Sequence, residues 1–127
     1  MSVESTKLIN NLAFEITSHE FKINFDVPEK LGGNNTAPTP HDYYEAALAG
    51  CTSITVMMYA KRKQIPLENI DVKIKIISEG AKNEISREIK FIGNLSEEQI
   101  ASLTMIADKC PIHKLISAGA HITTQIL

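Results

Sequence analysis

Two cysteines are the residues best suited to chemistry in this sequence. Cys51 lies in a long apolar run, and Cys110 stands directly before a proline in the stretch KCPIH. A cysteine thiolate is a strong nucleophile and a good metal ligand, but free cysteines are also among the most frequently buried residues. The pair therefore leaves three interpretations open, which are a thiol redox site, a metal site and two plain core residues.

A metal or phosphate site finds little support in the spacing. Cys110 and His113 form half of a zinc-like pattern, but no Cys or His stands within four positions of Cys51. The Gly32-Gly33 pair lacks the lysine and the spacing of a phosphate-binding loop. The sequence also has no Gly-x-Ser-x-Gly elbow that would indicate a hydrolase. We therefore expect no metal and no other cofactor.

The pattern of apolar residues predicts an α+β fold that positions the two cysteines on helices. Strands are expected within residues 6–27 with a turn at 17–20, and further strands are expected over 70–77, 85–92 and 121–127. A first helix is expected from a Thr39 cap to about Gln64, with Pro66 ending it. A second helix is expected from a Ser96 cap, with Gln99 completing a capping box, to Cys110, and a short segment follows over 112–118.

The first predicted helix is apolar on nearly all sides between Tyr43 and Ala60. Such a helix must be buried on all sides, and about 25 residues make it roughly 37 Å long, longer than a small domain is wide. A membrane span is one explanation, but Glu45 and the Ser/Thr run argue against it. A homodimer that buries this helix is the better explanation, and we expect no membrane partner.

Composition sets the class of protein and its compartment. The chain has 127 residues, which predicts a single domain over 1–127, and its formal net charge of -2 argues against nucleic acid as a partner. The basic cluster at 61–63 is explained by the helix end, where positive charge complements the dipole. The N-terminus lacks the pattern of a signal peptide, so we expect a cytoplasmic protein with reduced thiols.

Two motifs resemble the OsmC/Ohr family of osmotically inducible and organic-hydroperoxide-resistance proteins. The stretch GGNNTAPTPHDYYEAALAGCTSITVMMYAKRKQIPLENIDV is similar to the first-cysteine region of the family, and IADKCPIHKLI is similar to the second-cysteine motif of its OsmC-like branch. The resemblance implies an OsmC-like fold, in which antiparallel sheets wrap around long central helices in an intertwined homodimer. It also implies a peroxidase in which Cys51 is the peroxidatic residue and Cys110 the resolving one.

The resemblance further implies a charged group that activates the first cysteine. Well-characterised members use an arginine from an N-terminal strand, held by an acidic residue at the start of the long helix. Asp42 occupies that acidic position, although a helix-capping role explains it equally well, and it would have to act from the partner subunit. The only arginines are Arg62 and Arg87, outside the N-terminal strands, so Lys22 or His19 are the candidate substitutes.

The resulting prediction is a cysteine-dependent hydroperoxide reductase. Its expected partners are a small organic hydroperoxide, a dithiol reductant and a second copy of the chain. Five residues are candidates to line an apolar pocket, with the dimer core as the alternative explanation: Tyr43, Tyr44, Met57, Met58 and Tyr59. The competing hypothesis is a non-catalytic or weakly active ligand-binding or redox-sensing protein that lacks the activating arginine.

Overall fold

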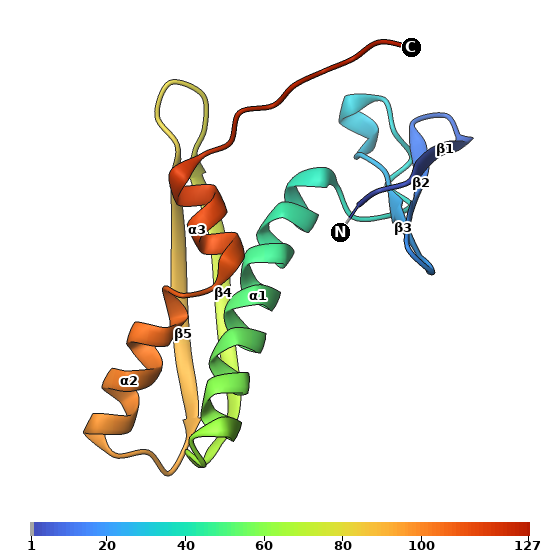
Figure 1. Ribbon diagram of the computed structural model, residues 1–127. Helices are drawn as coiled ribbons and strands as arrows, with labels where there is room; N and C mark the ends of the chain where they lie inside the picture. The colour runs from blue at the N-terminus through green and yellow to red at the C-terminus, as the bar shows by residue number, and fades with distance from the viewer. Residues whose placement is uncertain (1) are drawn as a thin grey trace. The chain divides into compact units, whose positions relative to one another are not determined.

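A computed structural model describes residues 2–127 as two compact units, which divide between Tyr44 and Glu45. The strands of each unit are antiparallel and are accompanied by helices, so the expected α+β class is confirmed. The long helix α1 (Pro40–Arg62) runs across the division (Figure 1).

The N-terminal unit carries a three-stranded sheet with the order β1-β2-β3. Its strands are β1 (Ser5–Asn10), β2 (Ala13–Ser18) and β3 (Phe21–Phe25). Phe14 pairs with Phe25 and Ile16 with Ile23, which confirms the predicted alternation. The strands predicted within residues 6–27 did not include a turn after β1. Leu12 lies in this turn, and Asn11 has a positive φ of 52° there.

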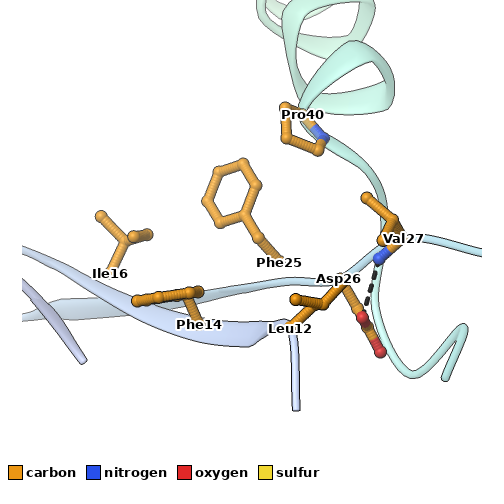
Figure 2. Close-up of a pocket in the computed structure, with 7 residues that line it drawn as sticks. All are labelled: Leu12, Phe14, Ile16, Phe25, Asp26, Val27 and Pro40. Atoms are coloured by element: carbon orange, nitrogen blue, oxygen red, sulfur yellow. Dashed lines mark hydrogen bonds between the residues drawn. The ribbon is translucent and has the colours of Figure 1, made fainter. Parts of the chain in front are cut away.

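A loop with a short 3-10 helix, η1 (Glu29–Leu31), joins β3 to α1. The buried carboxylate of Asp26 organises this loop by accepting hydrogen bonds from the Val27 N–H at 2.8 Å and from both the N–H and the hydroxyl of Thr36. Gly33 is required here, because a Cβ at this position would meet the Val27 carbonyl oxygen at 2.1 Å. Asp26 also borders a shallow apolar hollow of about 260 Å³ beside Phe14, Ile16 and Phe25 (Figure 2).

The C-terminal unit is built on a long hairpin of β4 (Leu67–Ser78) and β5 (Glu84–Gly93), close to the predicted strands. Helix α2 (Glu97–Ala107) follows, and its predicted Ser96/Gln99 capping box is present. It ends before Cys110, three residues earlier than expected, and α3 (Pro111–Ala118) begins directly after that cysteine. Helices α1, α2 and α3 lie on one side of the hairpin (Figure 1).

The core of this unit joins α1, β4 and α2. Its buried residues are Val56, Ala60, Leu67, Leu103 and Ala107. The buried positions of α1 recur every four residues, at Leu48, Thr52, Val56 and Ala60, so one face of this helix is covered. Other positions stay open: Ile54 is 62% and Met58 65% exposed in the single chain.

The prediction of a last strand over 121–127 was wrong. These residues have no regular secondary structure, and Ile122 and Ile126 are 82% and 88% exposed (Figure 1). A strand forms only where its backbone N–H and C=O groups find a second strand to pair with. Within residues 2–127 this segment pairs with none, so its alternating pattern is not enough to make it a strand.

Candidate functional site

Cys51 lies in the middle of α1, on the turn between the buried residues Leu48 and Thr52. Its side chain is half-buried, and its Sγ lies 3.9 Å from Thr55 Oγ1, one helical turn later. Residues four apart on a helix lie on the same face, which explains this contact. The thiol is therefore held against a hydroxyl donor while part of it stays open.

Cys110 is the fully buried N-cap residue of α3. Pro111 occupies the first helical position, where its missing N–H is not needed. The Sγ of Cys110 accepts a hydrogen bond from the His113 N–H at 3.4 Å. The break between α2 and α3 thus places this sulfur at the start of α3, where it caps the helix.

The fold brings the two cysteines together although about 60 residues separate them in the sequence. Their thiols lie close enough for each to shift the pKa of the other, and the backbone N–H of Ile112 at the start of α3 also acts on Cys51. Burial raises the pKa of Cys51, but hydrogen bonds from Cys110, Ile112 and Thr55 together bring it below its ordinary value. Burial and the neighbouring Cys51 sulfur raise the pKa of Cys110.

The site contains Arg87, which the sequence did not predict there. Arg87, on β5, donates hydrogen bonds to Thr52 Oγ1 and to the Ala107 carbonyl oxygen, both at 3.2 Å. It also forms an ion pair with Asp108, with 2.6 Å between Nη2 and Oδ1. Its side chain is only 14% exposed.

A sequence signal for Arg87 existed in the strand alternation. It stands opposite Ile74, and the pairs on either side along the same face are Ile76–Ile85 and Val72–Ile89. A charged residue in the inward register of an apolar strand must find partners or a buried charge results. The prediction placed the cation in the N-terminal strands and therefore did not include Arg87.

The remaining predicted residues lie in the N-terminal unit or at its end. Lys22 pairs with Glu15 at 3.4 Å, and His19 occupies the turn between β2 and β3 with a φ of 54°. Asp42 accepts a hydrogen bond from the Thr39 N–H at 2.9 Å, while the Asp42 N–H donates to Thr39 Oγ1 at 3.1 Å. These reciprocal bonds give Asp42 its capping role, and they lower its carboxyl pKa.

The five residues suggested for an apolar pocket have different surroundings. Met57 and Tyr59 pack against the core of the C-terminal unit within the single chain, so a place in a dimer core stays a prediction for them. Tyr43 stacks on Phe25 with ring centroids 4.2 Å apart and donates its hydroxyl to the Asn24 carbonyl oxygen. Tyr44 and Met58 are exposed.

Metal ligands and membrane spans are two further features of residues 2–127 that bear on function. Over that range no three His, Cys, Asp or Glu side chains gather in a way that would hold a metal ion. None of the helices there has the length and apolar character needed to cross a membrane.

Comparison with known proteins places the fold and the family. A protein of Psychrobacter arcticus described as an osmotic stress induced and detoxification response protein has a TM-score of 0.74 at 18% identity, with 90% of this chain and 87% of that chain covered. The OsmC-like protein of Mycoplasma pneumoniae has a TM-score of 0.71 at 18% identity, with 92% and 88% covered. The organic hydroperoxide resistance protein OsmC of Legionella pneumophila has a TM-score of 0.61 at 20% identity, with 91% and 89% covered.

These structures establish a shared fold, and their low identities establish no more than that. Among curated proteins, none is similar enough in sequence to match this chain. The family pattern of OsmC-like proteins matches residues 32–125, a range that contains both cysteines, the intervening hairpin and α2. The chain therefore belongs to the family of OsmC-like proteins, as its two cysteine motifs indicated.

Proposed function

We propose that the protein is a thiol-dependent hydroperoxide reductase of the cytoplasm, with Cys51 as the peroxidatic and Cys110 as the resolving cysteine. The observation that carries the proposal is the proximity of these two thiols, because each of them shifts the pKa of the other. The Legionella pneumophila protein of the same fold is an organic hydroperoxide resistance protein, which supports organic hydroperoxides as the substrate class.

The surroundings of the two sulfurs support different roles. Three donors stabilise the Cys51 thiolate and lower the pKa of this residue, and the thiolate is the form that attacks. Cys110 is fully buried and its pKa is raised, so it keeps its proton at the pH at which Cys51 loses one. A half-buried nucleophile and a buried protonated partner fit attack by Cys51 followed by resolution by Cys110.

The reaction balances in three steps. The Cys51 thiolate takes the outer oxygen of ROOH, the O–O bond breaks, and RO⁻ leaves and takes a proton as ROH, which leaves Cys51 as a sulfenic acid. The Cys110 thiol then forms the S–S bond with Cys51, and the hydroxyl and the thiol proton leave as water. An external dithiol reduces the disulfide by exchange and is itself oxidised to a disulfide.

Asp42 enters this proposal as a carboxylate that acts on the cysteine pair of a second subunit. Its pKa is lowered by hydrogen bonds from Thr39, so it stays ionised at neutral pH. Asp42→Asn keeps an oxygen that can accept from Thr39 but removes the charge, and we expect it to lower turnover. Thr39→Ala is the matched control, because it removes half of the reciprocal cap and keeps the charge; equal losses in both variants would reduce Asp42 to its capping role.

A homodimer is part of the same proposal. Ile54 and Met58 on α1 are large apolar side chains that the single chain leaves open. Their burial by a second copy is favourable at roughly 25 cal/mol per Å² of apolar surface. Light scattering at micromolar concentration should therefore report twice the 14.0 kDa of one chain, and a monomer would contradict the architecture.

The deciding experiment is oxidation of the reduced protein with one equivalent of cumene hydroperoxide. We expect both free thiols to disappear, and mass spectrometry to find Cys51 joined to Cys110 within one chain. Cys51→Ser should abolish peroxide consumption, whereas Cys110→Ser should consume one equivalent and stop at a sulfenic acid. Oxidation of Cys110 alone, or links only between chains, would refute the assigned roles.

One observation favours a second candidate, a redox sensor that is oxidised once and turns over poorly. The hydrogen-bond donors that lower the pKa of Cys51 are a thiol, a hydroxyl and a backbone amide, and all three are neutral. Continuous hydroperoxide consumption with dithiothreitol separates the two candidates. A reductase turns over many times, while a sensor reacts once and its disulfide is reduced slowly.

A further inference from the structure

We propose that Arg87 is a positioning residue that holds the segment carrying Cys110 against the segment carrying Cys51. This inference rests on the proposed function, because it assigns a part of the disulfide-forming step to a residue whose guanidinium bonds Thr52, Ala107 and Asp108 and acts on the sulfurs only through them. The geometry points to it through the three acceptors of the guanidinium, which belong to the two cysteine-bearing regions.

The first region is α1. Thr52 follows Cys51 directly in the sequence and is completely buried, and its Oγ1 accepts a hydrogen bond from Arg87 Nη1 at 3.2 Å. The residue next to the nucleophile is therefore tied to β5 through a side chain that has no access to water. At the turn that carries Cys51, this bond restrains the position of α1 along its axis and its rotation about that axis.

The second region is the break between α2 and α3. The Ala107 carbonyl oxygen at the end of α2 accepts from Arg87 at 3.2 Å, and the Asp108 carboxylate accepts at 2.6 Å. Asp108 Oδ1 also lies 3.8 Å from His113 Nε2, on the far side of Cys110. The N–H of that same His113 donates to the Cys110 sulfur. Arg87 thus reaches the residues on both sides of Cys110, one of them through Asp108.

The chemistry of arginine suits this task better than that of lysine. The guanidinium presents five N–H donors in a rigid plane and bonds several acceptors at once, whereas an ammonium is a compact charge on a flexible stem. A largely buried arginine also costs desolvation, and a well-packed apolar residue often stabilises such a position as well or better. An arginine at an inward position of β5 is therefore better explained by the geometry it imposes than by stability alone.

The inference predicts that Arg87 speeds closure of the disulfide more than it speeds the first attack. Closure requires the two sulfurs to approach to about 2.05 Å with a restricted dihedral angle, so it depends on where the two backbone segments sit. Attack on a free hydroperoxide requires only the Cys51 thiolate and an open path. Loss of the three hydrogen bonds should slow closure about tenfold, which corresponds to about 1.4 kcal/mol of lost positioning.

The test measures closure in full-length Arg87→Gln, Arg87→Lys and Asp108→Ala, with Arg62→Gln as the matched control. Arg62 is the other arginine of the chain and lies over the Tyr59 ring, 5.6 Å from its centroid. Sulfenic acid is trapped with dimedone at timed intervals after a cumene hydroperoxide pulse. We expect the sulfenic acid to live longer in Arg87→Gln and equally long in Arg87→Lys. Disulfide closure should be slowed less in Asp108→Ala, and it should keep the wild-type rate in Arg62→Gln.

A second readout keeps this inference separate from the proposed function. Oxidised glutathione converts the two thiols to the intramolecular disulfide and releases two molecules of reduced glutathione, without any peroxide. The equilibrium for this exchange should shift about tenfold against the disulfide in Arg87→Gln. If the protein ignores hydroperoxides but shows this shift, the proposed function fails and the role of Arg87 stands.

Other outcomes would overturn the role of Arg87. Unchanged closure and an unchanged glutathione equilibrium in Arg87→Gln would do so while leaving the peroxidase proposal intact. Full recovery in Arg87→Lys would show that charge alone matters. If Arg87→Gln does not fold, the result of Asp108→Ala decides, because Asp108 is 66% exposed and its removal leaves the core untouched; closure at the wild-type rate in that variant would refute the inference.

Discussion

Replacing Thr52 by valine should destabilise the C-terminal unit, and the structure allows the size of the effect to be estimated. Valine has nearly the same shape as threonine, so the change creates no cavity beside the core residue Val56. It removes the oxygen that accepts the hydrogen bond from Arg87 at 3.2 Å. The loss therefore falls on a charged donor in a place where Thr52 itself is completely buried.

Two opposing contributions decide the outcome. A buried donor left without its acceptor costs about 1–3 kcal/mol. The methyl group that replaces the hydroxyl is apolar and buried, which returns about 0.8 kcal/mol. Arg87 keeps its bonds to Ala107 and Asp108, so the lower part of the first range is the better guide. The net loss of unfolding free energy should be about 0.2–1.2 kcal/mol.

Urea denaturation measures this loss as a lower midpoint at an unchanged slope. Thr104→Val is the matched control, because Thr104 is exposed and its hydroxyl bonds only the Ile100 carbonyl oxygen of its own helix, at 2.8 Å. Its effect should stay within about 0.5 kcal/mol. A double-mutant cycle with Arg87→Met then isolates the coupling between Thr52 and Arg87. A Thr52→Val protein as stable as the wild type, with no coupling in the cycle, would refute the reasoning.

Three further predictions follow from single contacts. The pKa of Cys51 is lowered and that of Cys110 is raised, so iodoacetamide should alkylate Cys51 at lower pH than Cys110. Thr55→Val removes a donor to the Cys51 thiolate and should therefore move the pH profile of Cys51 alkylation to higher pH. Leu103→Ala should cost about 3–5 kcal/mol in urea denaturation, because Leu103 is fully buried; a loss below about 1 kcal/mol would mean a loosely packed core. Gly33→Ala should destabilise the loop after β3, since its Cβ would meet a backbone oxygen at 2.1 Å, and limited proteolysis that cuts this loop no faster than in the wild type would contradict that expectation.

Local signals in the sequence predicted most of the elements correctly. Ser96 and Gln99 form the predicted capping box, and the β4–β5 hairpin closely matches the alternation of its residues. These features depend on neighbours a few positions away, so a single stretch of sequence contains them. Helix α2 ends earlier than predicted because Cys110 is not the last residue of that helix, and its sulfur caps the next one.

The predicted last strand fails for a different physical reason. Residues 121–127 have the alternation of a strand, but alternation describes side chains, and a strand also requires a backbone edge to pair with. Where that edge lies is a property of the whole fold and not of the segment. The same holds for α1, whose open residues Ile54 and Met58 are apolar without a covering surface in the single chain.

The candidate site shows where sequence reasoning about charge needs the register of a sheet. Position along the chain predicts a cation from the N-terminal strands and makes Lys22 a candidate, but Lys22 pairs with Glu15 on the same small sheet. A search by face would have asked which polar residue occupies an inward position of an apolar strand. On β5 that residue is Arg87, because its partner across the hairpin is Ile74. A buried cation needs hydrogen-bond acceptors, and Arg87 finds them at Thr52 and at Ala107 and Asp108. Because Thr52 follows Cys51 and the other two lie shortly before Cys110, the inward charge on β5 indicates where both cysteines lie.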